Sequence, residues 1–193
     1  MTDNNIIEEN KIDVISIGQA DMCNAFANGS LGVISSGIVW LVSALAAYQF
    51  SAKHAIWTLL IGGVFIHPLS IILSKIVGQS GQPSKENPLA KLALEGTIFM
   101  LMCIPPAFGL SQIKPEWFFQ GMLLVIGGRY LTFATIYGKK VYWLLGGALG
   151  IAAMILFRLQ ADSFLSALTG SLIEIIFGLY LYFGFRKTNA QIG

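Results

Sequence analysis

The sequence predicts an all-α fold: a polytopic transmembrane bundle of about six helices arranged in antiparallel hairpins. Hydrophobic residues make up 55% of the 193 positions and charged residues only 11%, with a mean hydropathy of +0.69. Water-soluble domains carry about 25% charged residues, so this chain has too few charges to cover a surface that faces water. Six apolar runs, each close to the roughly 20 residues that cross a hydrocarbon core, alternate with polar links. The expected environment, and the first expected partner, is the lipid bilayer.

The first 30 residues are polar and precede the first apolar run. Acidic and amide side chains dominate the first ten positions. A secretory signal peptide begins with basic residues followed by a short apolar core, so we expect no cleavable signal in this segment. We interpret residues 1–30 as a polar, partly helical segment on the cytoplasmic side, residues 31–187 as the six-span domain, and residues 188–193 as a short tail.

The six spans follow from the apolar runs and from the links between them. The links SAKH and GKK are so short that the helices they join must be antiparallel, and a longer polar loop, GQSGQPSKENP, separates the second span from the third. Pro68 lies in the middle of the second span, where it removes one backbone hydrogen bond and predicts a kink. The expected spans are residues 31–50, 54–77, 89–110, 117–137, 141–159 and 164–185.

The basic residues predict the orientation of the bundle, because loops that carry Lys and Arg stay in the cytoplasm. With the N-terminus inside, eight basic residues lie on the inner side, namely Lys11, Lys75, Lys85, Lys91, Lys139, Lys140, Arg186 and Lys187. Three lie on the outer side, namely Lys53, Lys114 and Arg158. We therefore expect a multi-pass protein of the cell membrane with both termini in the cytoplasm.

Three ionisable residues lie deep inside the even-numbered spans. His67, Arg129 and Glu174 each lie about ten to thirteen residues into a span that runs from outside to inside. At 1.5 Å per residue this places them roughly 15 to 20 Å from the outer boundary, in one layer near the middle of the bilayer. Ionisable groups at this depth are costly and usually functional, so this layer is the candidate site.

Arg129 and Glu174 carry opposite charges, and two arrangements explain them. An unpaired arginine at the centre of a span costs about 2.5 to 3.5 kcal/mol on insertion scales, so a direct ion pair is the simplest arrangement. Alternatively, both charges face one water-filled cavity. A direct pair would be either a substrate site or a structural clamp between helices. His67 is either a proton acceptor beside the pair or a hydrogen-bonded packing residue.

Hydroxyl residues and small residues surround these groups. Thr132 lies three positions after Arg129, and Ser171 lies three positions before Glu174. Glu95 follows Lys91 by one helical turn, which predicts either a surface ion pair or an entry-side carboxylate. Asn28 and Ser36 belong to a polar stripe that leads into the first span. That stripe would line a cytoplasmic vestibule or dock on the loop before the third span.

Several protein classes and site types are not indicated by the sequence. It has no nucleotide-binding, serine-hydrolase or zinc-protease motif, so we expect no enzyme and no catalytic residue. Cys23 and Cys103 lie far apart and outside any metal-binding spacing, so we expect no metal, no cofactor and no disulfide framework. No basic cluster is dense enough for nucleic acid.

Three segments resemble a bacterial family of small multi-pass membrane proteins of unknown function. They are HPLSIILSK in the second span, NPLAKLAL at the start of the third, and GRYLTFATIYGKKVYW across the fourth and fifth. The resemblance covers most of residues 31–150 and leaves out the first thirty. It implies a membrane bundle in a bacterial inner membrane and names no substrate. The signature positions are His67, Pro68, Asn87, Pro88, Arg129, Tyr130, Tyr137 and Gly138.

These observations favour one function and leave a second open. In the first, the protein is a small-solute or ion transporter whose Arg129, Glu174 and His67 contact an anionic or protonatable solute. In the second, it is a non-transporting membrane module, such as a sensor or an assembly subunit, whose buried ion pair is structural. Gly146 and Gly150 form a GxxxG pair that serves the packing of the bundle or a homo-oligomer.

Overall fold

The computed structural model describes residues 2–190, with side chains from Val14 onward except at Asn189. Within this range the chain forms seven α-helices, and six of them are long and apolar enough to cross a membrane. The all-helical, multi-pass fold predicted from the sequence is confirmed. The helices are α1 (Thr2–Phe26), α2 (Ser30–Gln49), α3 (Ala52–Ile76), α4 (Pro88–Ser111), α5 (Pro115–Tyr137), α6 (Val141–Arg158) and α7 (Ser163–Asn189).

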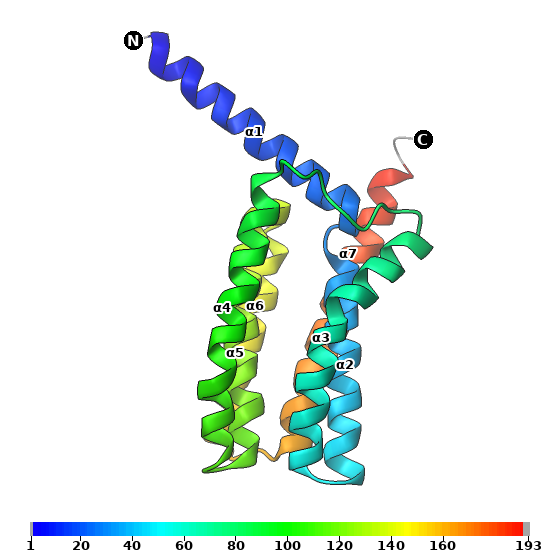
Figure 1. The fold of residues 1–193 in the computed structure, drawn as a ribbon, viewed down its shortest axis with the longest axis vertical. Coiled ribbons are helices and arrows are strands. Elements are labelled where there is room, and N and C mark those ends of the chain that lie inside the picture. Colours follow the sequence, from blue (N-terminus) through cyan, green and yellow to red (C-terminus); the bar gives the residue numbers. More distant parts are fainter. Residues whose placement is uncertain (1, 191–193) are drawn as a thin grey trace.

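The six spanning helices pack as two groups of three. One group consists of α2, α3 and α7, and the other of α4, α5 and α6 (Figure 1). We call these the first triad and the second triad. Although α6 and α7 are consecutive, α6 packs mainly on α5 and α7 mainly on α2. Both chain ends lie at the same end of the bundle, which we call the terminal end.

Glycines allow close contact between α2 and α7 in the first triad. A Cβ atom added at Gly37 would lie 2.7 Å from Cγ1 of Ile175, and one at Gly178 would lie 2.6 Å from Cγ1 of Ile34. Ser171 on α7 donates a hydrogen bond of 2.8 Å to the carbonyl oxygen of Gly37. In lipid, the burial of apolar side chains does not drive helices together, because the lipid tails are equally apolar. Helices are held together instead by the close packing of small residues and by interhelical hydrogen bonds.

The second triad uses the same device between α5 and α6. A Cβ at Gly127 would lie 2.8 Å from the carbonyl oxygen of Gly146. Gly146 of the GxxxG pair therefore packs within the bundle. The same Cβ at Gly127 would lie 3.4 Å from the backbone nitrogen of Gly150, so both glycines of the pair line the contact with α5.

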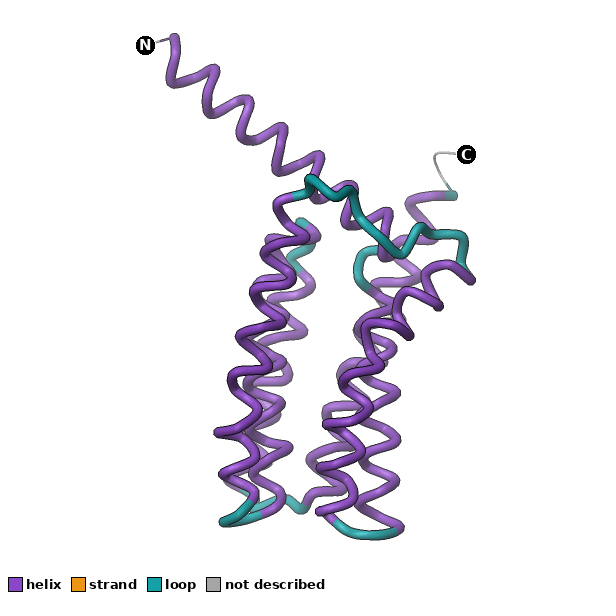
Figure 2. The backbone as a smooth tube through the Cα atoms, in the orientation of Figure 1, coloured by secondary structure: helices purple, strands orange, loops and turns teal. Residues whose placement is uncertain are grey.

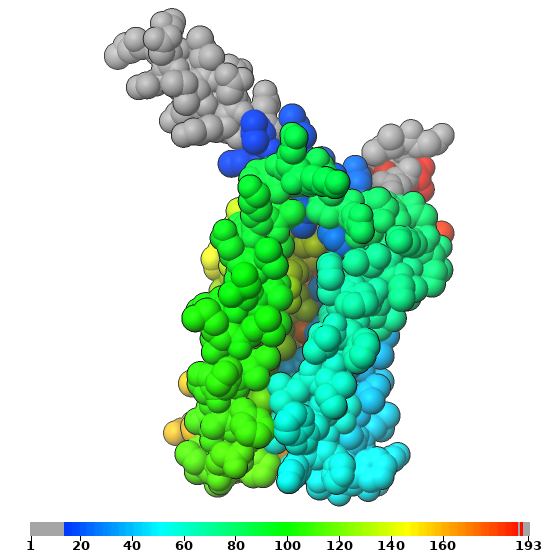
Figure 3. Space-filling view, viewed as in Figure 1, coloured from blue at the N-terminus to red at the C-terminus, as the bar shows by residue number. Residues whose placement is uncertain are grey.

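A furrow separates α3 from α4 on one face of the molecule. Figure 3 shows it as a hollow below α1, through which atoms of deeper helices are visible. Toward the other end the two helices come together, where the rings of Trp57 and Phe108 lie 6.1 Å apart. Pro68 lies inside α3, and the C-terminal part of this helix bends away from α4, as expected from the proline (Figure 1). Behind the furrow lies α5, which contacts both α3 and α4.

Helix α1 crosses the terminal end and binds both the second triad and the α3–α4 loop. Gln19 donates to the carbonyl oxygen of Thr135 on α5 at 2.8 Å. Asp21 accepts from the backbone N–H of Ser84 at 2.8 Å and from the side chain of Asn87 at 2.7 Å. Figure 2 shows the loop running across the bundle beside α1. The predicted docking of the polar segment on this loop is therefore found in the structure.

The chain turns from the oblique α1 into α2 through three residues with positive φ angles (Figure 1). Ala27, Asn28 and Gly29 have φ angles of 49°, 60° and 76°. Gly29 packs against the rings of Tyr137 and Tyr142, where a Cβ atom would overlap both side chains. Residues other than glycine rarely adopt positive φ angles, and at position 29 there is also no room for a Cβ atom, so the turn needs glycine there.

The predicted span boundaries agree with the helices to within a few residues. In the segment expected to be partly helical, residues 2–26 form one continuous helix that ends before the turn at residues 27–29. Residues 191–193 of the predicted tail lie outside the described residues. Large apolar side chains such as Val64, Met102 and Ile176 are exposed along the spans, as expected for a surface that faces lipid.

Candidate functional site

Glu174 is the most deeply buried charged side chain in the described part of the chain. It lies in the middle of α7 and is 0% exposed. Its Oε1 atom accepts a hydrogen bond of 2.9 Å from the hydroxyl of Tyr130, whereas its Oε2 atom has no hydrogen-bond partner. The hydroxyl of Ser36 on α2 is close enough to interact electrostatically with this carboxyl group. No Lys, Arg or His among the described side chains forms an ion pair with it.

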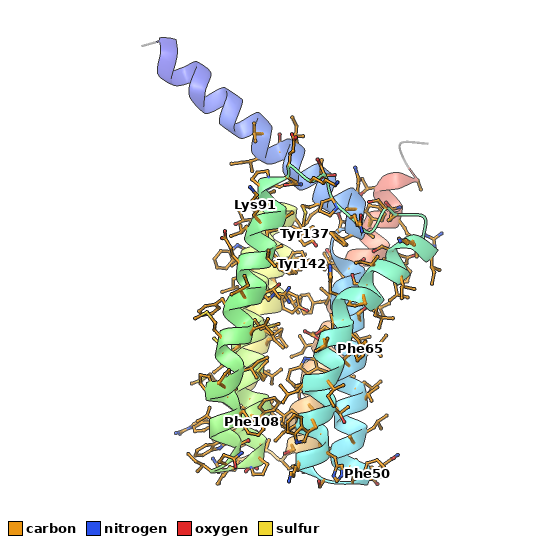
Figure 4. The ribbon with its side chains drawn as sticks, in the orientation of Figure 1. Phe50, Phe65, Lys91, Phe108, Tyr137 and Tyr142 are labelled. Atoms are coloured by element: carbon orange, nitrogen blue, oxygen red, sulfur yellow. The ribbon has the colours of Figure 1, made fainter. Side chains whose placement is uncertain are left out.

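Tyr130 connects the two triads through this hydrogen bond. It belongs to α5 in the second triad, and Glu174 belongs to α7 in the first. The ring of Tyr130 stacks on Tyr142 at 6.1 Å between centroids, and Tyr142 stacks on Tyr137 at 5.4 Å. Phe133 adds edge-on contacts to these rings. Figure 4 shows Tyr137 and Tyr142 between the triads, below α1.

Arg129 is directed toward α4. Its Nη2 atom donates to Oγ1 of Thr97 at 2.9 Å, and its Nη1 atom lies 4.0 Å from the sulfur of Met100. The guanidinium carbon lies 5.0 Å from the centroid of the Phe133 ring, within the range of a cation–π contact. The Nε atom is buried without a partner, although the side chain as a whole remains partly exposed.

The direct ion pair predicted between Arg129 and Glu174 is not present in the described residues. Arg129 bonds Thr97, and Glu174 bonds the neighbouring Tyr130 instead. Successive residues on a helix point in directions about 100° apart, so Arg129 faces α4 while Tyr130 faces α7. The two charges still lie at a similar depth, because Tyr130, which binds Glu174, is the next residue after Arg129. The alternative in which both charges face one water-filled cavity stays a prediction.

The remaining predicted residues of the layer have different positions. His67 is exposed on α3 and makes no hydrogen bond among the described residues, so it is not the hydrogen-bonded packing residue of one alternative. The group beside Glu174, where the other alternative placed His67, is Tyr130. Thr132 donates to the backbone carbonyl of Arg129 at 2.7 Å and does not reach its guanidinium. Ser171 is fully buried and holds α7 to α2.

The three secondary candidates lie in different parts of the molecule. Glu95 and Lys91 are both exposed, and no ion pair joins them in the described structure. Asn28 is buried in the turn before α2, and its carbonyl oxygen accepts from the hydroxyl of Tyr142 at 2.7 Å. Ser36 is the one secondary candidate that lies beside Glu174. No three His, Cys, Asp or Glu side chains of residues 14–188 come together as metal ligands would.

One comparison with known proteins identifies the family of the chain. The model of DUF7010, a family of unknown function, matches residues 16–184. The chain belongs to this family. The resemblance to a family of unknown function is therefore confirmed, and the six apolar helices make this member of DUF7010 a multi-pass membrane protein. No curated protein and no solved structure matches the chain.

The match extends the family beyond the segments that carried the resemblance. It begins at residue 16 and thus includes the part of α1 that docks on the bundle, which the sequence resemblance left out. It also includes Thr97, which lies outside those segments and binds Arg129, and Tyr130, which lies inside one of them and binds Glu174. Tyr130 lies among the signature positions of the resemblance, but neither residue was predicted to contact a charge. The sequence signal that could have indicated these contacts is that both residues carry a hydroxyl group at mid-span depth.

Proposed function

We propose that this DUF7010 protein carries a small anionic or protonatable solute across the membrane, and that the solute contacts Arg129 in the furrow between α3 and α4. The observation that supports this best is the incomplete pairing of Arg129. It lies in the middle of a spanning helix, yet among the described side chains its polar partners are a threonine hydroxyl and a methionine sulfur.

A guanidinium group in a span needs acceptors for its hydrogen bonds. Arg129 has five N–H donors, and its Nε atom is buried without a partner. No carboxylate of the described chain neutralises its charge within ion-pair distance. A bound carboxylate or phosphate group supplies two acceptor oxygens in the geometry that guanidinium prefers, together with the missing negative charge. This favours an anionic group on the solute.

The two-triad architecture gives such a site a route of access. The triads contact each other less extensively than the helices within each triad do, and the furrow lies between them. Many transporters place their substrate site near the middle of the bilayer, between two helix groups that rock against each other. We infer from the distribution of Lys and Arg that the terminal end faces the cytoplasm of the cell.

A thermal-shift screen on the purified protein tests the binding step. Small carboxylates, phosphates and inorganic anions are added one at a time to wild type, to Arg129→Gln and to Arg158→Gln as the matched control. Arg158 lies exposed at the end of α6, away from the layer. We expect at least one anion to raise the unfolding temperature of wild type and of Arg158→Gln, and to leave Arg129→Gln unchanged.

Transport is then measured with that anion in reconstituted vesicles. The proposal predicts uptake by wild type and by Arg158→Gln, and loss of uptake by Arg129→Gln that elutes as a folded protein. If no anion protects wild type, or if Arg129→Gln keeps full uptake, the transporter proposal is overturned. The alternative of a sensor or assembly subunit would then rest on the Tyr130–Glu174 bond as a fixed clamp between the triads.

A further inference from the structure

We infer that Glu174 is a reversible proton-binding site, and that its hydrogen bond with Tyr130 links proton binding to the relative position of the two triads. The proton-binding part stands on the geometry around the carboxyl group. The link to solute movement rests on the proposed function.

The surroundings of Glu174 disfavour a permanent negative charge. The side chain is 0% exposed, in the middle of a helix that crosses lipid. Taking an ionised carboxylate out of water costs many kcal/mol unless a cation pairs with it, and such groups become neutral instead. Arg129 acts on Glu174 only from a distance, because its own hydrogen bond is directed to Thr97 on α4.

The neighbouring helices contribute few groups that would stabilise the ionised form of the carboxyl group. From α5, Tyr130 donates to Oε1, and Arg129 contributes its distant charge. From α2, the hydroxyl of Ser36 faces the carboxyl group, and α2 contains no charged residue. No titratable group of α3 or α6 within the described residues interacts directly with Glu174. The Oε2 atom has no direct hydrogen bond among the described residues, although the Ser36 hydroxyl lies near the carboxyl group, so we place the proton on Oε2.

The Tyr130–Glu174 bond gives proton binding a mechanical consequence. This bond joins α5 of the second triad to α7 of the first. A hydrogen bond to an ionised carboxylate is roughly twice as strong as one to a neutral acceptor. Release of the proton from Oε2 to water therefore strengthens the contact between the triads, and uptake of a proton from water weakens it. In each cycle, Glu174 takes up one H⁺ from water when the contact between the triads weakens and returns one H⁺ to water when the contact strengthens.

Infrared difference spectroscopy on the full-length protein in lipid nanodiscs tests proton binding directly. A protonated carboxyl group has a C=O stretching band that an ionised one lacks. We expect wild type to show this band at neutral pH and to lose it as the pH is raised. Glu174→Gln should lack the band at every pH, whereas Glu95→Gln should retain it, because Glu95 is an exposed carboxylate of the adjacent triad.

Tyr130→Phe separates the hydrogen bond from the proton site. We expect the carboxyl band to remain in this variant and to shift in frequency, because Oε1 loses its donor. Absence of the band in wild type at neutral pH, its persistence in Glu174→Gln, or a band that never disappears on alkaline titration would each overturn the inference. A normal band in a protein that moves no solute would count against the proposed function alone.

Discussion

Tyr130 and Arg129 are adjacent in the sequence, but they perform different tasks because they leave α5 in different directions. Tyr130 satisfies one oxygen of a buried carboxyl group on another helix, and Arg129 reaches the hydroxyl of Thr97. An interhelical hydrogen bond in a membrane protein contributes about 0.6 kcal/mol on average, with a maximum near 1.7 kcal/mol. The contact is therefore of modest energy, which suits a bond that breaks and re-forms.

The stability of the Tyr130–Glu174 bond can be measured by substitution. We predict that Tyr130→Phe lowers the free energy of unfolding by about 0.6 to 1.7 kcal/mol, because one hydrogen bond is lost and little volume changes. Tyr180→Phe is the control, since Tyr180 is exposed on α7. The measurement is denaturant unfolding in detergent micelles. Equal stability of the two variants would show that the bond contributes nothing.

Cys23 reports on the docking of α1. Its thiol donates to the carbonyl oxygen of Tyr137 at 3.3 Å, and burial raises its pKa above the ordinary value, with Lys139 opposing this in part. Only the thiolate reacts with alkylating reagents. A raised pKa leaves less thiolate at neutral pH, so alkylation should be slow there and should accelerate as the pH rises.

The alkylation rate is measured against pH in a Cys103→Ser background. Asn87→Ala removes a side chain that bonds both Asp21 and the carbonyl oxygen of Gly18, and it should speed the reaction at neutral pH by loosening α1. If Cys23 in the otherwise unchanged protein reacts as fast as a free thiol in solution, the docked position of α1 is contradicted.

At this scale the sequence predicted which charges lie in the middle of a span and not which atoms they contact. The depth of Arg129 and Glu174 follows from counting residues along apolar runs. Their partners depend on the rotation of α5 and on the distance between α4 and α5, and neither is encoded in the spacing of charges along one helix. The simplest hypothesis paired the opposite charges with each other, but each charge instead binds a hydroxyl group, Arg129 that of Thr97 and Glu174 that of Tyr130.

At the scale of single elements, α5 and α6 show how glycine position determines helix contact. Gly127 and Gly128 are adjacent, but only Gly127 faces α6 closely, where an added Cβ would lie 2.8 Å from the Gly146 carbonyl oxygen. Gly128 has open space within 4 Å of its Cβ position. The pair therefore offers a matched test of packing in a spanning helix.

We predict that Gly127→Ala destabilises the protein by about 1 to 3 kcal/mol, because the methyl group forces two backbones apart. Gly128→Ala should leave stability unchanged or raise it slightly, because alanine favours helix over glycine. Thermal unfolding midpoints in detergent compare the two variants with wild type. Equal midpoints for both variants would contradict the close contact of α5 and α6.

The sequence predicted the six spans well, because their length and apolar character follow from the thickness of the membrane. It predicted the contacts of α1 less fully. The polar stripe suggested docking on the α3–α4 loop, but the bond from Gln19 to the backbone of Thr135 joins residues 116 positions apart. The two-triad grouping could not be predicted either. The short link between α6 and α7 suggests that they form a hairpin, whereas α6 packs mainly on α5 and α7 mainly on α2.

At the scale of the whole molecule, the proposed transport requires a furrow that reaches the layer of Arg129. The two triads meet through α7 against α5 and α6 and through α3 against α5, and α3 and α4 diverge toward the terminal end (Figure 1). If water enters this space, the charges lie beside an aqueous path. If lipid fills it, Arg129 has no route to a solute.

Cysteine accessibility on α4 distinguishes these cases most directly. Thr97 contacts Arg129 and is partly buried, while Phe99 lies two residues further along α4 and is 62% exposed. The two positions differ by only about 3 Å in depth. Single variants Thr97→Cys and Phe99→Cys are made in a background without Cys23 and Cys103, in liposomes, and treated with a charged, membrane-impermeant thiol reagent. The account predicts that Thr97→Cys is labelled and Phe99→Cys is not, whereas no labelling at Thr97→Cys, or equal labelling of both, would contradict it.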